Sequence, residues 1–381
     1  MRNHLLKLKK YEDIFDYLFL FIIFFDRSLI PSLENKIIEY VVLLFSFSFF
    51  ALKMVIRKEK IKKSKFINLW IIYSLTIILS NIINRSDYYQ GIGNLVVIGL
   101  FIYNIAYVSK DLTLKVSISY ILCTLINLIY SFINYGFQIP YSGVFGNPNY
   151  FGLNCLIMLI ASMYLFINDI YKKSSLFLIL ISIILCLLSE STSIFIQTII
   201  IVLVFIFIYK DSLKYKLSKI KNGFVIPLSI IGLLIGAIFA YFPLKKIYIK
   251  FFIYGGGITS FRSEIWTNII TNISFFGHAN NRYEITNGFS EHNIFFAKLN
   301  SVGILPFIFL IIFVFVIIYF TYKYYRLNKE KFFIYFILTI ILFLEGMNEE
   351  FFGLSLTSPA LYIMLILGDF FRLEGKENAK D

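Results

Sequence analysis

Side chains able to do chemistry gather in one polar interval of an otherwise apolar sequence, between about residues 244 and 301. Within it, a helical pattern runs from Ser260 to Ile273, with one apolar side suited to lying on a membrane surface. Arg262 falls near the middle of that apolar side, so its guanidinium either contacts lipid headgroups or meets another anion at the same depth. Three glycines, 255–257, precede it, and the free N–H groups of a helix start favour a phosphate. Loose headgroup contact is an equally weighted alternative.

The second stretch of this kind is 290–293, Ser-Glu-His-Asn, which stands directly before an apolar run. Ser290 is a suitable N-cap, so the sequence predicts His292 in the first turn of a short helix that ends near Gly303. A helix N-terminus disfavours imidazolium and leaves a neutral ring that can accept a proton. The alternative is an exposed loop histidine, which is commoner for a lone histidine, and His278 fits that alternative better.

A third feature is the glycine-bounded stretch 143–152, which contains Gly-Asn-Pro-Asn at 146–149. Proline at an early helical position after an asparagine is ordinary chemistry for a helix start. By itself, the stretch therefore predicts only a turn that opens a helix.

The composition predicts an all-α polytopic membrane protein. Apolar residues make up 59% of the 381 residues and charged residues only 15%, whereas a globular protein in water needs a more polar surface. Since one crossing takes roughly 20 residues, we expect about 12 transmembrane helices, with a range of 10–12, in a single integral domain spanning 1–381. The net charge of +13 lies in short clusters between apolar runs, which favours a topological role over nucleic-acid binding. The three cysteines lie within apolar runs and indicate no disulfide or metal site.

Charge asymmetry predicts the orientation. With the N-terminus in the cytoplasm and the spans alternating, most of the 36 Lys and Arg fall on the cytoplasmic side. The stretch 244–301 is then a large extracytoplasmic loop with short amphipathic helices, and both termini are cytoplasmic. The expected apolar runs are 14–30, 37–55, 67–84, 92–108, 114–134, 150–168, 175–190, 193–209, 223–243, 302–322, 332–346 and 351–371.

Taken together, three stretches resemble the bacterial O-antigen polymerase and ligase family, which assembles or transfers polyprenyl-linked polysaccharides. The first is Gly-Asn-Pro-Asn at 146–149, which opens a helix. The second is Arg262 followed by Trp266, with Gly277 after them. The third is His292-Asn293 with Gly303 downstream, ahead of the next span. Their order and spacing extend over about the C-terminal two thirds of the chain.

The resemblance implies a membrane glycosyltransferase that uses an undecaprenyl-pyrophosphate-linked oligosaccharide, with no cofactor and no metal at the site. In that family pattern, Arg262 holds the donor pyrophosphate and His292 helps to activate the acceptor hydroxyl. Many relatives carry Ser-Arg where this chain has Ser191-Thr192, so Arg282 or Arg85 would have to replace that second arginine. The remaining expected substrate-binding residues are Asn293, Glu264, Trp266, Asn147 and Asn149.

The preferred hypothesis is a polymerase that joins lipid-linked repeat units, on the outer face of the bacterial cytoplasmic membrane, by an inverting reaction. A ligase that transfers finished glycan to another acceptor is the nearest alternative, and a lipid-linked oligosaccharide flippase is a third. Expected partners are the lipid-linked glycan, as donor and acceptor, and the bilayer, with a chain-length regulator and a flippase beside them; nucleic acid is not expected. The abundance of Ile, Lys and Asn points to an AT-rich genome and favours capsule or another surface glycan.

Overall fold

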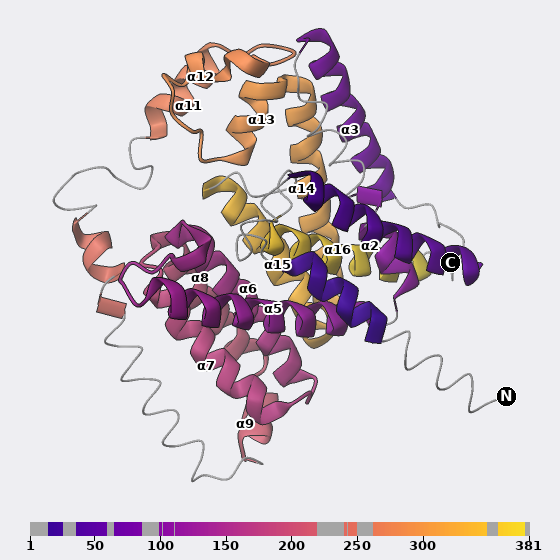
Figure 1. Ribbon diagram of the computed structural model, residues 1–381, viewed down its shortest axis with the longest axis vertical. Helices are drawn as coiled ribbons and strands as arrows, with labels where there is room; N and C mark the ends of the chain where they lie inside the picture. The colour runs from indigo at the N-terminus through magenta and orange to yellow at the C-terminus, as the bar shows by residue number, and fades with distance from the viewer. Residues whose placement is uncertain are drawn as a thin grey trace. The chain divides into compact units, whose positions relative to one another are not determined.

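The computed structural model describes residues 14–25, 36–58, 65–85, 99–100, 102–109, 111–218, 240–241, 243–249, 262–348 and 357–377. The regular elements within these ranges are all helices, as the apolar runs predict (Figure 1). They fall into two compact units, of which the first contains Met1–Lys53 and Ser109–Tyr248, and the second Met54–Val108 and Ile249–Asp381. The single integral domain expected from the sequence stays a prediction.

The helices are those of a membrane-embedded protein. In the part of the chain that the structure describes, four are long and apolar enough to cross a bilayer: Phe66–Ile83, Leu112–Tyr135, Pro148–Ile167 and Ile304–Leu327. Other helices also turn large apolar side chains outward, and Phe207 is 82% exposed. Such surfaces are unfavourable in water and suit a hydrocarbon surrounding. The full count of about twelve spans stays a prediction, and most of the run 223–243 lies outside the described residues.

The first unit is organised around α6, which is buried along nearly its whole length because α5, α7 and α8 pack against it. A helix that is apolar on every side is stable only within a larger assembly or a membrane. The elements of this unit are the helix Ile14–Phe24, α2 (Lys36–Ile56), α5 (Leu112–Tyr135), η3 (Gly143–Phe145), α6 (Pro148–Ile167), α7 (Lys172–Leu188), α8 (Thr192–Ile208) and α9 (Lys210–Ser218).

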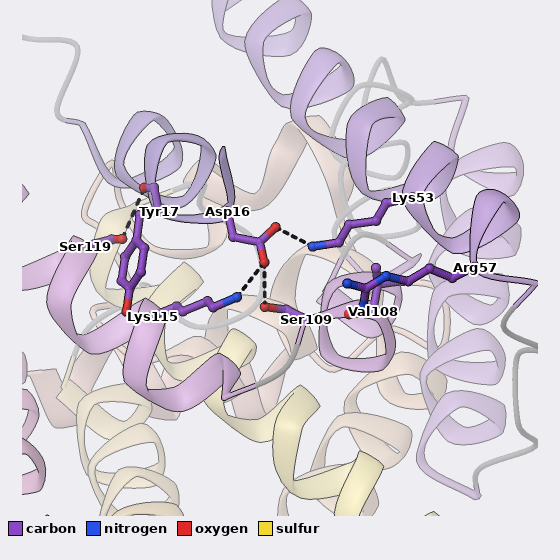
Figure 2. A network of polar contacts seen from close by, with 8 residues as sticks. All are labelled: Asp16, Tyr17, Lys53, Arg57, Val108, Ser109, Lys115 and Ser119. Atoms are coloured by element: carbon purple, nitrogen blue, oxygen red, sulfur yellow. Dashed lines mark hydrogen bonds and ion pairs between the residues drawn. The ribbon is translucent and has the colours of Figure 1, made fainter. Parts of the chain in front are cut away.

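A buried ionic network joins three helices of the first unit (Figure 2). The fully buried Asp16 carboxylate accepts from Lys53 and Lys115, and each Nζ lies 2.7 Å from one of its oxygens. The Ser109 hydroxyl donates to the same carboxylate over 3.4 Å. Charges in a membrane interior are costly unless they are paired, so the network ties the helix Ile14–Phe24, α2 and α5 together at one level.

The residues of this network lie at helix ends that alternate in direction. Asp16 is near the start of its helix, Lys53 is near the end of α2, and Lys115 is in the first turn of α5. When consecutive helices cross a bilayer in alternating directions, the start of one helix and the end of the next lie on the same side of the membrane. The topology expected from the charge pattern also places all three on one side, the cytoplasmic one, and which side it is stays a prediction.

The second unit surrounds α14, which packs against α3, α13 and α15, while α16 packs against α15. Asp369 of α16 is buried and accepts from the Tyr335 hydroxyl of α15 at 3.0 Å and from Arg372 at 2.7 Å. The elements of this unit are α3 (Lys65–Ile83), a helix at 102–108, α11 (Arg262–Thr271), η5 (Ala279–Asn281), α12 (Arg282–Ile285), α13 (Ile294–Val302), α14 (Ile304–Leu327), α15 (Lys329–Asn348) and α16 (Ser358–Glu377).

Replacing Asp16 by asparagine should lower the thermal stability of the protein strongly. The substitution removes the negative charge that two buried ammonium groups contact, and breaking a buried pair in this way costs on the order of 3–5 kcal/mol. The measurement is the midpoint of thermal unfolding in detergent micelles, followed by fluorescence-detected size exclusion. Asp169→Asn is the matched control, because Asp169 is 61% exposed and its pair with Lys172 spans 3.8 Å. Equal midpoints for the two variants would contradict the role of the network.

Candidate functional site

Residues 262–303 form a small helical module, here named the α11–α13 module, at one end of the second unit (Figure 1). The module rests on the C-terminal end of α3, where the Ser80 hydroxyl donates to the carbonyls of Phe276 and Val302. Asn84, at the end of the same helix, also donates to the Phe276 carbonyl. The polar end of α3 is therefore used to hold the module in place.

Two glycines make a close backbone crossing inside the module. A Cβ at Gly277 would lie only 2.5 Å from the Ser301 carbonyl carbon and 2.6 Å from the Gly303 nitrogen. Gly277 has a φ of 76° and Gly303 a φ of 88°, a region that residues with a Cβ rarely adopt. Gly303 also ends α13 and begins α14, and the Ile304 N–H donates to the Phe275 carbonyl at 3.2 Å. The close backbone approach and the positive φ thus explain why glycine occupies both positions, 277 and 303, that the sequence analysis singled out.

The expected loop helix is present as α11, with bounds Arg262–Thr271, while Ser260 and Phe261 lie outside the described residues. Part of its apolar side packs on protein. The Trp266 ring stacks on Phe296 of α13 at 5.1 Å, and Ile269 is buried. Ile270 is 52% exposed, so the rest of the apolar side stays open to the surroundings.

The Trp266 indole also fixes α11 to the segment that carries His292. Its Nε1–H donates to the carbonyl of Glu291 at 3.0 Å, and Glu291 immediately precedes His292. Arg262 lies four residues before Trp266, so the two Cα positions share one face of α11, one turn apart. Arg262 is half-buried, and Glu264, in the same first turn, is exposed. The structure therefore holds the turn carrying Arg262 near the segment carrying His292.

The N-cap of α13 is Asn293, which corrects the expectation that Ser290 caps this helix. The Asn293 side-chain oxygen accepts from the N–H groups of Phe295 and Phe296 at 2.9 and 3.2 Å. Its amide nitrogen donates to the Met347 carbonyl at the end of α15 over 3.1 Å, so the fully buried Asn293 joins two helices. Asparagine suits this position because its cap acceptor and its donor to α15 are two separate atoms of the amide, Oδ1 and Nδ2.

His292 consequently precedes α13 and does not lie in its first turn, so the helix-dipole argument does not apply to it. Its backbone has a φ of 47°, in the left-handed region that a residue with a Cβ rarely occupies. Such a conformation costs on the order of 1–3 kcal/mol and persists only where the surroundings impose it. The buried residues on both sides, Glu291 and Asn293, supply that constraint, and His292 itself is half-buried.

Glu291 and Asn300 form the buried centre of the module. The Glu291 side chain is fully buried, and its Oε1 accepts from Asn300 Nδ2 at 2.9 Å. The same nitrogen donates to the Arg282 carbonyl at 3.0 Å. Glu291 Oε2 and Asn300 Oδ1 are buried without a hydrogen-bond donor in the structure. Buried acceptors without a donor are energetically costly.

Both arginines considered as replacements for the missing second arginine belong to the second unit. Arg282 is half-buried, lies over the Tyr283 ring with its guanidinium carbon 4.6 Å from the ring centre, and donates to the Tyr283 hydroxyl at 2.6 Å. Arg85 is exposed directly after Asn84, at the end of α3 that holds the module. Both therefore lie in or beside the elements that carry Arg262 and His292.

The remaining expected site residues belong to the first unit. Asn147 is the N-cap of α6, and its side chain accepts from the Asn149 N–H at 2.8 Å, with Pro148 at the first helical position. The expected helix start is confirmed. Ser191, Thr192 and Ser193 lie at the start of α8. The structure thus groups Arg262, Trp266 and His292 in one module, and it keeps Asn147 and Asn149 in a separately described unit.

No model of a known protein family matches this chain, and no curated protein is significantly similar to it. The residues of this chain and their geometry are therefore the basis for assigning a function.

Reasoning from the sequence missed the residues that hold the module together. Ser80 and Asn84 end an apolar run and gave no sign of contacting a segment about two hundred residues away. Asn300 follows Lys298 in a run that is otherwise apolar, and a polar residue inside a short helix was the one available signal. Glu291 was weighed only as a neighbour of His292, although its carbonyl and its carboxylate are both engaged.

Replacing Asn293 by alanine should destabilise the protein more than the same change at Asn147. Both residues cap a helix, and loss of a cap costs about 1 kcal/mol, but Asn293 is also buried and bonded to the end of α15. The expected result is a clearly lower unfolding midpoint for Asn293→Ala than for Asn147→Ala in the same detergent. If Asn147→Ala lowered the midpoint as much, the link to α15 would contribute nothing.

Proposed function

We propose that this protein is a membrane glycosyltransferase that joins lipid-linked oligosaccharide repeat units through a diphosphate-activated sugar. The observation that carries the proposal is the Trp266–Glu291 hydrogen bond, which holds the helix of Arg262 to the segment of His292. A fixed cation and a group able to accept a proton are the two parts that such a transfer needs. The order of motifs that resembles the O-antigen polymerase and ligase family supports the same reading.

The proposed reaction is a single displacement. The acceptor hydroxyl gives its proton to His292 while its oxygen forms a bond to the anomeric carbon of the donor sugar. The bond between that carbon and the diphosphate oxygen breaks, and the electron pair leaves with the lipid diphosphate. Arg262 stabilises the charge that develops on the leaving group. Attack on the face opposite the leaving group inverts the anomeric configuration, and no protein carboxylate has to act as a nucleophile.

The exposed part of the apolar side of α11 is suited to contact the lipid that carries the donor sugar in this reaction. A polyprenyl diphosphate has its charge at headgroup depth and its tail in hydrocarbon, and an interfacial helix reaches both. Arg262 is half-buried and lies on the same face of α11 as the packed Trp266. We further propose that the module faces the outside of the bacterial cytoplasmic membrane, where repeat units are delivered by a flippase and where a chain-length regulator acts.

Arg262→Ala and His292→Ala should each abolish polymer while the amount of protein in the membrane stays unchanged. The measurement is the length distribution of the surface glycan and of the lipid-linked intermediates in cells that carry each variant. Polymerase loss leaves single lipid-linked repeats, ligase loss leaves long unattached chains, and flippase loss leaves precursor facing inward. The three hypotheses therefore give three different products.

Matched controls for this experiment are His278→Ala and Arg326→Ala. His278 belongs to the same module, where its ring bonds the Asn272 carbonyl at 2.6 Å, and Arg326 is exposed at the other end of α14. Both variants should keep normal polymer. Full-length polymer in Arg262→Ala or in His292→Ala would remove that residue from the mechanism.

The proposed sidedness is tested by cysteine labelling, because all three native cysteines are buried. A cysteine at Phe289, which is 63% exposed, should react in intact cells with a maleimide that does not cross membranes. A cysteine at Lys214, exposed on α9, should react only after the membrane is permeabilised. The reverse pattern would place the module in the cytoplasm and exclude the proposed function.

A further inference from the structure

The first unit has a basic end, formed by the start of α7 and by α9 (Figure 1). Helices α6, α7 and α8 pack against one another and are joined by short connections, so they alternate in direction. The start of α7 and the end of α8 therefore lie at the same end of this bundle, and α9 follows α8 after a break at Tyr209. The basic end is defined by three lysines and two tyrosines, Lys173, Lys210, Lys214, Tyr171 and Tyr215.

The two ends of the bundle differ in charge. The connection 168–173 and the stretch 209–215, at the basic end, contain four lysines and two aspartates. At the opposite end, the loop 136–147 and the turn 189–191 contain a single charged residue, Glu190. Only the basic end therefore offers charge that is complementary to an anion.

The lysines of the basic end are available to bind an anion. All three are exposed, and within the described residues none of them forms an ion pair, whereas the neighbouring Lys172 pairs with Asp169. Lys210 and Lys214 are four residues apart on α9, so they extend from one face with Cβ atoms about 5–6 Å apart. Asp211 is also exposed on α9, and in the part of the chain that the structure describes it forms no ion pair with either lysine. Two ammonium groups on one face can therefore contact a single anion together.

The depth of this face in the membrane identifies the anion as a lipid headgroup. The 17 residues of α8 carry no charge, and Lys210 is the first charged residue after them. A helix of this length spans about 26 Å, which is close to the roughly 30 Å of a hydrocarbon core. The ammonium group of Lys210 then lies where phospholipids have their phosphates.

The aromatic residues at this end support the same depth. Phe207, three residues before Lys210, is 82% exposed, which suits contact with acyl chains. Tyr171 is 71% exposed and Tyr215 is 60% exposed. Tyrosine is enriched at membrane–water interfaces, because its ring is apolar and its hydroxyl is polar. A soluble anion needs neither the exposed phenylalanine nor the tyrosines, whereas a lipid contacts both.

We propose that Lys210 and Lys214 bind the phosphate of an anionic phospholipid between them, and that Lys173 adds to the attraction at the same end of the bundle. The bound lipid holds α9 at the membrane surface directly after the break at Tyr209. The proposal depends on the membrane setting of the first unit. It is independent of the proposed glycosyltransferase activity, whose residues Arg262 and His292 belong to the second unit.

The test measures which lipid lies beside α9 in the full-length protein. A fluorophore is attached through Tyr215→Cys, because the native cysteines are buried, and the protein is reconstituted in phosphatidylcholine vesicles. A small fraction of the lipid is either phosphatidylglycerol or phosphatidylcholine that carries a nitroxide quencher on one acyl chain. Because the two quenchers differ only in the headgroup, stronger quenching by phosphatidylglycerol reports binding of the anionic lipid. This stronger quenching is the expected result.

The double variant Lys210→Gln with Lys214→Gln should lose the preference for phosphatidylglycerol, by about fivefold in relative binding constant for each lysine removed. The matched control is Lys245→Gln with Lys246→Gln. These two lysines are exposed in the same unit, but they are adjacent in sequence and do not share a helix face. The control should keep the preference.

Equal quenching by the two lipids before the lysines are replaced would overturn the proposal. An undiminished preference in the double variant, or an equal loss in the control, would do the same. Inorganic phosphate added at constant ionic strength separates a lipid from a soluble anion, and it should leave the preference unchanged. If inorganic phosphate abolished the preference, the two lysines would belong to a site for a soluble anion.

Discussion

The hydrogen bond from the Trp266 indole to the Glu291 carbonyl is the contact on which the rest of the candidate site depends. It is formed between a helix and a segment that are 25 residues apart, and the stack of Trp266 on Phe296 keeps the two in one orientation. An indole N–H has one direction and no acceptor role, so this bond sets both distance and angle. A cation on α11 and a histidine before α13 can act on one ligand only if this contact persists.

The position of the module follows from a general constraint on backbone groups near a membrane. Carbonyls at helix ends and in loops need donors, because little water is available to replace them. Ser80 and Asn84 supply donors to the loop carbonyls, and Asn293 supplies one to the end of α15. The crossing of Gly277 and Gly303 brings the two backbone segments close enough for these few donors to suffice. Short polar contacts at the ends of two helices, α3 and α15, thus help to position the module.

Buried carboxylates elsewhere in the protein are also paired with donors from neighbouring side chains. Asp16 lies between two lysines in the first unit, and Asp369 lies between a tyrosine and an arginine in the second. The Asp16 network lies near helix ends, whereas Asp369 lies near the middle of α16 and is paired there with Tyr335 and Arg372. An apolar pocket of about 210 Å³ beside α3 is the complementary case, because its wall offers hydrocarbon and no free polar partner to a ligand.

Much of the secondary structure of this protein could be predicted from local patterns in the sequence. Apolar runs predicted helices, and the long described helices lie within or close to those runs, because burial in hydrocarbon depends mainly on composition over about 20 residues. The helix start at Asn147 and Pro148, the loop helix with Arg262 and the end of α13 at Gly303 were also predicted, since caps and glycine turns act over a few residues. The cap of α13 was misplaced by three residues because Ser290 and Asn293 are both good caps locally.

The carbonyl of Met347, more than fifty residues away, decided between those two caps. An asparagine at position 293 donates to this carbonyl, and a serine at position 293 does not. Only the tertiary structure revealed this contact, the Asp16 network, the Glu291–Asn300 pair and the pocket. Apart from the Glu291–Asn300 pair, whose members are nine residues apart, each joins residues that are distant in the chain. The sequence by itself determined which segments are helical and apolar, because those properties add up locally. Which polar groups meet was decided by packing, since one donor and one acceptor carry no local mark of their partner.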